Sequence, residues 1–434
     1  MYRRQSSSQM FQGAMKAVIL IGGPHVDPRF RPLSLELPQP LFPIAGVPLL
    51  QHHIEACTKL PDIKEILLIG FYQQSREMTR FFQDMHKHYG ILIKYLQEYC
   101  PLGTAGGIYH FRDQIMRGNP RGFFVFHSDV CCNFPVVEMN AFHEKVAKGK
   151  GFVILGAEAN ESQAINYGCI AEDPATHQVL HYVEKPETFV SSIVNAGAYI
   201  FTPAVFDQLG KVFQANHENE LIPEQARDTI DLERSLLSPL AGTGELFVYK
   251  MKTGFWCQVK NAGSAIYANR LYLSLMSENH PELLARQQSS DEGPCIIGDV
   301  RIHPTANVDR SATLGPNVYV GAGVNIGPGA RVKEAIVLDR AEIQDHSCVL
   351  HSVVGWNCVL GEWSRVEGYP CDPNPNDPLA SVQSESLFNQ EGRLNPSITI
   401  LGEGVSVHSE RMVLNSIVLP HKDLSNNYKN QIIL

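Results

Sequence analysis

Carboxylates and a lysine stand directly after apolar runs of this chain, where the ends of buried strands would place them. Asp129 closes the run FFVFHSD, and a carboxylate there can hold a magnesium ion or act as a turn-forming residue. Glu184 and Lys185 stand side by side before a proline. A glutamate accepts hydrogen bonds from hydroxyl groups and a lysine offers a point charge to a phosphate, whereas an exposed ion pair is the structural alternative.

A glycine pair and two arginines follow the first apolar run of the chain. Residues 17–21 are continuously apolar, which predicts a strand buried on both faces of a parallel sheet. Gly22 and Gly23 come next, and a glycine at a strand end lets the backbone approach a ligand closely. Arg29 and Arg31 are then candidate partners for phosphate. A surface turn with solvated arginines is the alternative interpretation.

The order of these motifs resembles that of the sugar-1-phosphate nucleotidyltransferases. That family opens with a strand, a Gly-Gly-x-Gly-Thr-Arg loop, a Pro-Leu pair and a Lys-Pro pair. This chain has, in the same order, Gly22, Gly23, Arg29, Pro32 and Leu33. Later blocks match as well. From Met15 to Leu434 the chain most resembles the GDP-mannose pyrophosphorylases (mannose-1-phosphate guanylyltransferases), and among them the regulatory alpha-subunit type.

The resemblance implies a binding site for GDP-mannose. The block QEYCPLGTAGG, residues 97–107, matches the family's base and sugar contacts, although a glycine-rich turn of this kind can also be purely structural. Asp129 matches the first magnesium ligand of the family. The residues that match binding positions of the family are Gly22, Gly23, Leu102, Gly103, Thr104, Gly106, Asp129, Tyr167, Gly168, Glu184, Lys185 and Asn195.

The reactive half of the predicted site departs from the family pattern. The first loop is two residues longer than the family's form. It has Asp27 and Pro28 in place of Gly-Thr, and these would repel phosphate and remove a backbone donor. Gln39 replaces the lysine of the Lys-Pro pair, and Gln258 replaces the second metal carboxylate. A neutral amide weakens a site for magnesium, which prefers anionic oxygens and stabilises the transferred phosphate.

These departures predict a site that binds ligand without efficient transfer. The degenerate positions are Arg29, Gln39 and Gln258, so no catalytic residue is assigned, and Asp129 remains the one candidate ligand for magnesium. We therefore interpret the chain as a regulatory subunit that binds GDP-mannose. It would mediate feedback inhibition of a homologous catalytic subunit in GDP-mannose biosynthesis for glycosylation. The alternative is an active mannose-1-phosphate guanylyltransferase that uses Asp129 and other acids.

Two interpretations come from other classes of protein. Exchange-factor subunits of translation initiation share a transferase domain followed by a β-helix, but they have usually lost the sugar block that this chain keeps. A hexapeptide acyltransferase would need a catalytic histidine in a cleft between coils. The candidates for that role are His303, His346 and His351, although turn histidines on a coil surface are commoner.

The elements that position the site alternate between strand and helix. Residues 65–72, 91–96 and 123–130 have strand patterns, and 48–60 and 74–88 have helical spacing. This alternation predicts right-handed crossovers and a mostly parallel, Rossmann-like sheet, with ligands at the carboxyl ends of its strands. A hairpin is expected over 166–186, and the charged segment 213–234 is expected to be a surface insertion.

A repeat with a period of six residues follows a polar linker. The apolar repeat positions are Ile296, Ile302, Val308, Leu314, Val320, Ile326, Val332 and Leu338, then Leu401, Val407, Val413 and Leu419 after a phase shift near 340. This pattern is typical of a left-handed parallel β-helix. The predicted domains are 1–14 (a disordered extension), 15–286 (nucleotidyltransferase-like) and 295–434 (β-helix). The last contains a long polar loop at 369–396, for which we predict contact with the catalytic partner.

Composition restricts the remaining possibilities. The chain has 434 residues, 19% of them charged, and a formal net charge of -9, which argues against nucleic-acid or anionic-membrane partners. No apolar run is long enough for a transmembrane helix. The ten cysteines show no zinc-like spacing and fit a reducing, cytoplasmic location. Both homo-oligomers and hetero-oligomers are expected.

Overall fold

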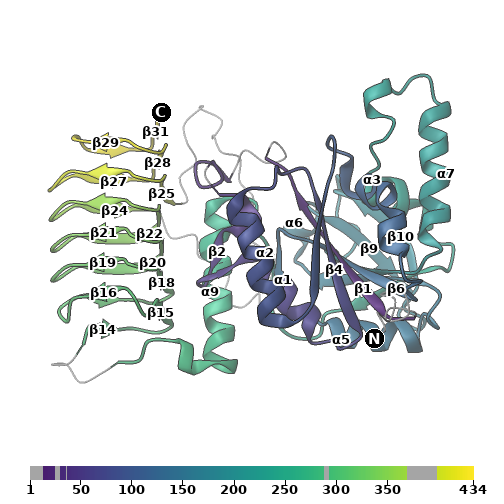
Figure 1. The fold of residues 1–434 in the computed structure, drawn as a ribbon, viewed down its shortest axis with the longest axis horizontal. Helices are drawn as coiled ribbons and strands as arrows, with labels where there is room; N and C mark the ends of the chain where they lie inside the picture. The colour runs from purple at the N-terminus through teal and green to yellow at the C-terminus, as the bar shows by residue number, and fades with distance from the viewer. Residues whose placement is uncertain (1–12, 25–29, 36, 288–292, 369–397) are drawn as a thin grey trace, which may run out of the picture. The chain divides into compact units, whose positions relative to one another are not determined.

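A computed structural model describes residues 13–24, 30–35, 37–287, 293–368 and 398–434 (Figure 1). These residues form two compact units, which we describe separately. The first contains the described residues up to 24 together with 50–256. The second contains 30–49 and everything described from 257 onward. Among the described helices, none combines the length and the apolar content needed to cross a lipid bilayer.

The first unit is built on one mixed sheet in the strand order β10-β9-β11-β6-β1-β4-β5, with β8 and β12 joined beside β11. Strands β1, β4, β5 and β6 run parallel, whereas β11 is antiparallel to β6 and begins the antiparallel part. The strand bounds of this sheet are β1 Met15–Gly22, β4 Ile63–Gly70, β5 Leu92–Gln97, β6 Gly122–His127, β8 Phe152–Glu158, β9 Gly168–Glu172, β10 Val179–Glu184, β11 Ile193–Phe201 and β12 Leu246–Lys250. A separate pair is formed by β7 Val130–Cys132 and β13 Trp256–Gln258, and the last two residues of β13 are grouped with the second unit. The predicted Rossmann-like sheet is therefore confirmed.

Helices pack against this sheet because their apolar faces complete its core. Ser75 caps the amphipathic helix α2, where its side chain accepts a hydrogen bond from the backbone N–H of Met78, and Gly90 ends the helix in a left-handed conformation. The helix bounds are α1 Leu49–Thr58, α2 Arg76–Tyr89, α3 Gly103–His110, α4 Arg112–Met116, α5 Val136–Lys145, α6 Glu161–Ala164, α7 Val205–Glu218 and α8 Ser238–Leu240, with short turns of other helix types at 224–226 and 233–237. Helix α3 follows β5 and therefore starts at the carboxyl edge of the parallel strands.

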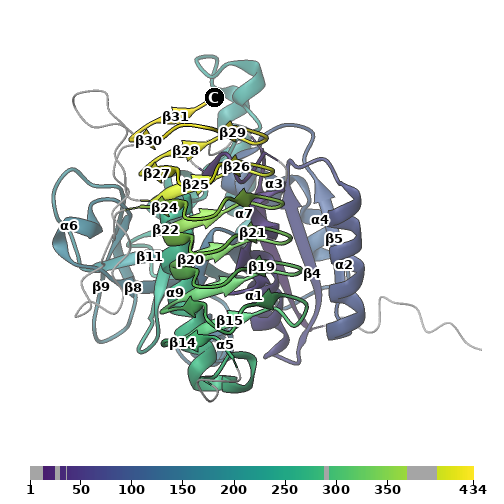
Figure 2. The ribbon, with the colours of Figure 1, turned by 90° about the vertical axis from the view of Figure 1, so that its left-hand side faces the viewer.

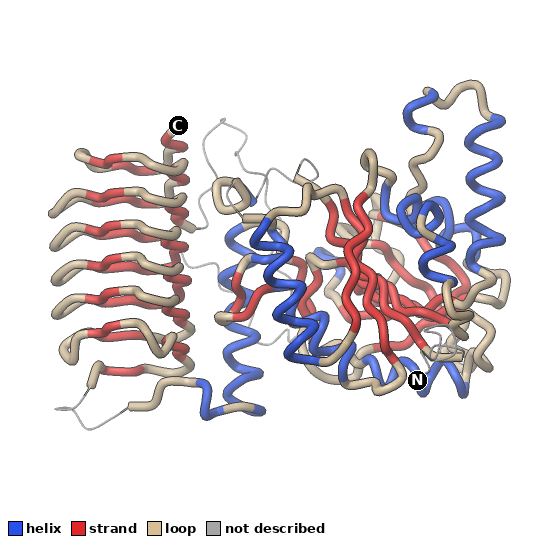
Figure 3. The backbone as a smooth tube through the Cα atoms, in the orientation of Figure 1, coloured by secondary structure: helices blue, strands red, loops and turns tan. Residues whose placement is uncertain are grey.

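The second unit is a β-helix with three faces, whose stacked coils are visible in Figures 2 and 3. Each face is a stack of parallel pairs between successive coils. The strands are β14 Cys295–Ile296, β15 Val300–Ile302, β16 Asn307–Val308, β17 Thr313–Leu314, β18 Val318–Val320, β19 Asn325–Ile326, β20 Arg331–Val337, β21 Glu342–Ile343, β22 Cys348–Val354, β23 Val359–Leu360, β24 Arg365–Glu367, β25 Thr399–Leu401, β26 Ser406–Val407, β27 Met412–Leu414, β28 Ile417–Val418, β29 Asp423–Leu424, β30 Tyr428–Lys429 and β31 Ile432–Ile433. Buried aliphatic residues from all three faces fill its core.

The coils shorten by one residue at Glu334, which corrects part of the predicted repeat. Leu314 pairs with Val332, eighteen residues on, whereas Val320 pairs with Val337, seventeen residues on. Glu334 has a φ of 48° and forms a tighter corner than the preceding coil has at the same edge. The predicted inward positions Leu338 and Leu419 were therefore wrong, because Val337 and Val418 fill the core instead.

Segment 30–49 and helix α9 (Ala262–Asn279) belong to this second unit. The buried Asn269 accepts a hydrogen bond from the backbone N–H of Ala45 at 2.9 Å and donates to Asn317 O at 3.4 Å. Arg270 forms an ion pair of 3.1 Å with Glu334, which is only 4% exposed. These bonds attach both segments to the coils. Other elements of this unit are the short hairpin β2 Pro43–Ile44 and β3 Val47–Pro48 and the turns at 39–41 and 281–283.

Candidate functional site

Asp129 and the glycine pair lie at the carboxyl edge of neighbouring parallel strands. Asp129 follows β6, and Gly22 ends β1, which pairs with β6 along its length. Gly22 has a φ of 67°, and a Cβ atom at this position would meet no other atom. The left-handed backbone conformation, and not a lack of space, therefore favours glycine here. Gly23 packs closely on Phe71. The next predicted residues, Asp27, Pro28 and Arg29, lie outside the described residues.

The predicted base loop at the start of α3 lies against another segment of the same unit. A Cβ atom on Gly103 would lie 2.6 Å from Ile230 O, and one on Gly106 would lie 2.7 Å from Asp228 O. Backbone N–H groups of Ala105 and Gly106 donate to Ile230 O at 2.9 and 3.3 Å, and Ile230 N donates to Leu102 O at 3.0 Å. In this structure the glycines therefore permit close approach of the chain's own backbone.

The side chain of Thr104 is held by the same segment. Its hydroxyl accepts a hydrogen bond from Leu232 N at 2.7 Å and donates to a carboxylate oxygen of Glu233 at 3.1 Å. The other oxygen of Glu233 lies 3.5 Å from Nε2 of His127, at the end of β6. Burial raises the pKa of Glu233, and the nearby His127 opposes that shift. Glu233 thus lies between Thr104 of the predicted base loop and His127 at the end of β6, the strand that Asp129 follows.

The prediction of a surface insertion over 213–234 is therefore wrong for its last part. Ile230 and Leu232 are fully buried and belong to the core of the first unit. Charged residues surround these two positions, so the composition of the segment hid them. A sequence signal did exist, because the two buried residues are separated by one exposed residue, as in a short extended segment with one buried face.

The sugar half of the predicted site is a connected set of hydrogen bonds. The hydroxyl of Tyr182 donates to Glu184 at 2.9 Å. Asn195 donates through Nδ2 to the hydroxyls of Tyr182 and Tyr199, at 3.0 and 2.8 Å. A Cβ atom on Gly168 would collide with the Tyr182 hydroxyl and the Glu184 carboxylate, which explains the glycine. Sequence reasoning missed Tyr182, although it stands two residues before Glu184 and so faces the same side of β10.

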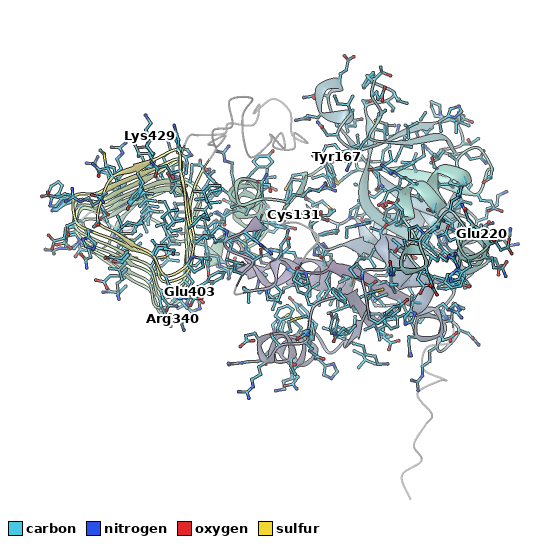
Figure 4. The ribbon with its side chains drawn as sticks, turned by 90° about the horizontal axis from the view of Figure 1, so that it is seen from above. Cys131, Tyr167, Glu220, Arg340, Glu403 and Lys429 are labelled. Carbon is cyan, nitrogen blue, oxygen red and sulfur yellow. The ribbon has the colours of Figure 1, made fainter. Side chains whose placement is uncertain are left out.

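Lys185 presents an exposed cation beside this set. Its φ of 48° is unusual for a lysine, and its backbone N–H donates to Tyr167 O at 3.2 Å. Within the described part of the chain Lys185 forms no ion pair, and Glu184 accepts a hydrogen bond from Tyr182. An exposed Glu184–Lys185 pair is thus not what the structure contains. Tyr167 packs edge-on against Trp256, whose ring N–H donates to Ala196 O at 2.9 Å. Figure 4 shows Tyr167 among the labelled side chains of this unit.

The two substituted glutamines lie in the second unit. Gln39 donates through its side-chain amide to Val259 O. This bond connects segment 30–49 to the part of the second unit that begins at residue 257. The side-chain oxygen of Gln258 is buried and accepts no hydrogen bond from any described residue. Across the described ranges no three His, Cys, Asp or Glu side chains converge as a metal site. Magnesium is usually held by one or two carboxylates together with substrate phosphates, and at the second family position Gln258 offers only a neutral amide oxygen.

The three histidines considered for acyl transfer lie at three different edges of the β-helix. His303 follows β15 and bonds through Nδ1 to the hydroxyl of Thr305 at 2.9 Å. His346 follows β21 and stacks on Trp363 with ring centroids 4.3 Å apart. His351 lies at the corner within β22 and has a φ of 47°. His303 and His346 are thus engaged by side chains at the corners of coils, as turn histidines on a coil surface commonly are.

Two protein families match the chain, one over each of its two main parts. Residues 16–270 match the family described as "Nucleotidyl transferase", and residues 296–433 match the "GMPPB C-terminal domain". The chain is thus a nucleotidyltransferase-fold protein with that C-terminal domain. It is 57% identical over 425 residues to "Mannose-1-phosphate guanylyltransferase regulatory subunit alpha-A" of Danio rerio, which covers 97% of this chain and all of the relative.

Two further relatives carry the name "Mannose-1-phosphate guanylyltransferase regulatory subunit alpha". The one from Xenopus tropicalis is 56% identical over 424 residues, and the one from Homo sapiens is 53% identical over 425 residues. Each match covers 97% of this chain and 100% of the relative. The chain belongs to the family of mannose-1-phosphate guanylyltransferase regulatory subunits alpha, which confirms the predicted resemblance.

Proposed function

We propose that this protein binds GDP-mannose in its first unit and regulates a homologous catalytic mannose-1-phosphate guanylyltransferase subunit, with little transferase activity of its own. One observation carries the proposal. Glu184, Tyr182 and Asn195, at the positions predicted to contact the sugar or next to them, are hydrogen-bonded in series beside an exposed Lys185. The family's lysine and second metal carboxylate are replaced by Gln39 and Gln258. The names of the relatives favour the regulatory role.

Binding of GDP-mannose, the product of the transfer reaction, requires fewer of the family's site residues than the reaction itself does. GDP-mannose has no γ-phosphate, so it needs the altered first loop less than GTP does. Transfer also needs stabilisation of developing charge, to which the missing lysine and carboxylate would contribute. Feedback inhibition follows if GDP-mannose binding changes how this chain acts on the catalytic subunit, because a ligand shifts an equilibrium only through different affinities for two states.

Calorimetric titration of the purified chain with GDP-mannose, GTP and UDP-glucose tests the proposal. We expect GDP-mannose to bind more tightly than the other two nucleotides. Assays with GTP and mannose 1-phosphate should show negligible turnover by the chain alone. Turnover within roughly tenfold of an active catalytic subunit, little more than 1 kcal/mol in barrier, would instead favour an active guanylyltransferase that uses Asp129. A mixed complex should be inhibited by GDP-mannose more strongly than the catalytic subunit by itself.

A further inference from the structure

One carboxylate of the first unit lies beside the predicted base loop and close to the predicted sugar half. Glu233 accepts a hydrogen bond from the Thr104 hydroxyl at 3.1 Å through one oxygen, and its other oxygen lies 3.5 Å from Nε2 of His127. The side chain of Glu233 is only 16% exposed. No motif of the sequence marks this glutamate, so its role has to be inferred from its contacts.

The backbone at Glu233 has an unusual conformation. Residues Glu233–Leu237 form a π-helix, in which the N–H of Ser238 donates to Glu233 O, five residues earlier in the chain. π-helices are rare, and they occur frequently at functional sites. Leu232 and Leu236 are buried in the core of the first unit. These leucines anchor the turn, so the Glu233 carboxylate starts from a fixed point of the backbone.

The charge of Glu233 also acts on the predicted sugar half. Burial raises the pKa of Glu233, His127 opposes that shift, and the carboxylates of Asp231 and Glu184 add to it. Burial likewise raises the pKa of the Tyr199 hydroxyl, and the charge of Glu233 adds to that shift. Because charge interactions weaken with distance, these effects indicate that Glu233 lies near the sugar half as well as beside the base loop.

We propose that Glu233 is a positioning residue for GDP-mannose, which holds the predicted base loop in place relative to the sugar half through its bond with Thr104. This inference rests on the proposed function. Guanine and mannose are the two ends of one ligand, so the two halves of the site must be correctly spaced to bind both ends at once. A site that is already correctly spaced loses less free energy in ordering when the ligand binds.

The contribution of the mannosyl group to affinity measures this spacing. The full chain is titrated by calorimetry with GDP-mannose and with GDP, which lacks the sugar, and the GDP dissociation constant is divided by that of GDP-mannose. Without the Thr104–Glu233 bond, the base loop can settle where it suits the nucleotide alone, and the sugar then adds less. Glu233→Met and Thr104→Val should each lower the ratio by about tenfold, since each nearly isosteric change removes a hydrogen bond to a carboxylate.

Conservative variants separate the bond from the charge and from the fold. Glu233→Gln keeps an oxygen acceptor and Thr104→Ser keeps a hydroxyl donor, so both should retain the wild-type ratio. The double variant with Met at 233 and Val at 104 should lower the ratio little more than either single change, because both changes break the same bond. Glu224→Ala is the matched control, since Glu224 is an exposed glutamate of the same segment, and it should leave both affinities unchanged.

Three outcomes would overturn the positioning role. Equal losses of affinity for GDP and GDP-mannose would show that Glu233 only maintains the base loop. A lower ratio in Glu233→Met with a wild-type ratio in Thr104→Val would mean that Glu233 contacts the sugar directly. A ratio in Glu233→Gln as low as in Glu233→Met would assign the effect to charge. Failure of the proposed function is distinct from all three, because it would be seen in a wild type that does not bind GDP-mannose.

Discussion

Lys185 combines a charge that suits a phosphate with a backbone conformation that suits glycine or asparagine. Its φ of 48° lies in the left-handed region, which costs a lysine about 1 kcal/mol or more. Residues in such a conformation cluster at functional sites, although the conformation persists wherever the surrounding structure fixes it. The strain here is relevant because the same residue is an exposed cation that directly follows Glu184 of the Glu184–Tyr182–Asn195 series.

We therefore predict opposite effects of Lys185→Asn on binding and on stability. GDP-mannose affinity should fall by about tenfold or more, because a charge-assisted phosphate contact is lost. The free energy of unfolding should stay equal or rise by up to about 1 kcal/mol, because asparagine tolerates the left-handed backbone better. Calorimetry and urea unfolding measure the two quantities. Lys148→Asn is the matched control, since Lys148 is exposed with a φ of 55° and lies outside the predicted site. Equal affinity loss in both variants would refute the assignment.

Glu98, in the predicted base block, should make the protein less stable as pH rises. Burial raises its pKa to about 7, although a hydrogen bond from the Leu102 backbone acts in the opposite direction. Between the ordinary value of 4.5 and about 7, the folded state holds more protons than the unfolded chain, so the free energy of unfolding falls with increasing pH. The loss over that window is about 3 kcal/mol at most.

Glu98→Gln should remove this dependence, because glutamine does not titrate and has nearly the same shape. The shape matters, since Gly107 packs directly against the Glu98 carboxyl. Urea unfolding at pH 5 and pH 8 gives the measurement. The variant should lose less stability than the wild type between the two pH values. Parallel stability curves for the two proteins would show that Glu98 titrates normally.

At the scale of single residues, candidate binding positions could be named from the sequence only where a motif marks them. Glu184, Lys185 and Asn195 were predicted, and the structure places Glu184 and Asn195 in one hydrogen-bonded series beside Lys185. Tyr182, His127 and Glu233 were not predicted, because their role depends on partners far away in the chain. Thr104 shows the same limit, since its hydroxyl is held by residues 232 and 233, more than a hundred positions later.

The start of helix α3 packs directly on the backbone of the segment that follows α7, because Gly103 and Gly106 have no side chain to separate the two. Gly106→Ala should destabilise the first unit by about 1 to 3 kcal/mol, since the new Cβ atom would lie 2.7 Å from Asp228 O. GDP-mannose affinity should fall with it if the base loop is displaced. Gly210→Ala, within α7, meets only ordinary contacts and should stabilise by about 0.5 to 1 kcal/mol. Urea unfolding measures the stability of both variants. If Gly210→Ala also destabilised the protein, the loss in Gly106→Ala could not be assigned to the contact with Asp228 O.

Prediction of the elements succeeded where a period was long and uninterrupted. The run at 17–21 lies within β1, and the six-residue repeat forms the coils of the second unit. The repeat predicted inward positions correctly up to Val332 and then failed at Leu338, because one residue is missing from the corner at Glu334. Two adjacent apolar residues, Val337 and Leu338, made either register compatible with the pattern. Only the pairing of coils resolves such a choice.

At the scale of the whole molecule, the order of segments in the chain does not match their grouping in space. A change in composition near residue 287 predicted the end of the first domain. In the structure, helix α9 and segment 30–49 group with the coils beyond that point. Composition could not reveal this, because α9 follows the nucleotidyltransferase block directly and has an ordinary helical sequence. Long-range polar contacts, such as Asn269 to Ala45 and Asn317, make the grouping.

This grouping predicts that a fragment ending at residue 286 will not fold as a stable unit. Helix α9 packs on β18, β20 and β22, and truncation removes all three strands. Asn269 would lose the acceptor Asn317 O, and Arg270 would lose Glu334. Removal of these strands would also expose the apolar side chains of α9 that they cover, at about 1.5 to 3 kcal/mol for each large one, and would add an aggregation risk. Since domains have about 5 to 15 kcal/mol of stability in total, these losses are severe.

Expression of residues 1–286 beside the full chain tests this prediction. We expect the fragment to aggregate or to lack a cooperative unfolding transition, whereas the full chain should unfold cooperatively. Glu334→Ala in the full chain is the matched milder change, since it removes the partner of Arg270 and the acceptor of the Asn317 side-chain amide but leaves the coils in place. It should lower the unfolding free energy without preventing folding. A soluble, cooperatively folded fragment would show that α9 and segment 30–49 are held by the first unit, and the predicted boundary at 286 would then be a true domain boundary.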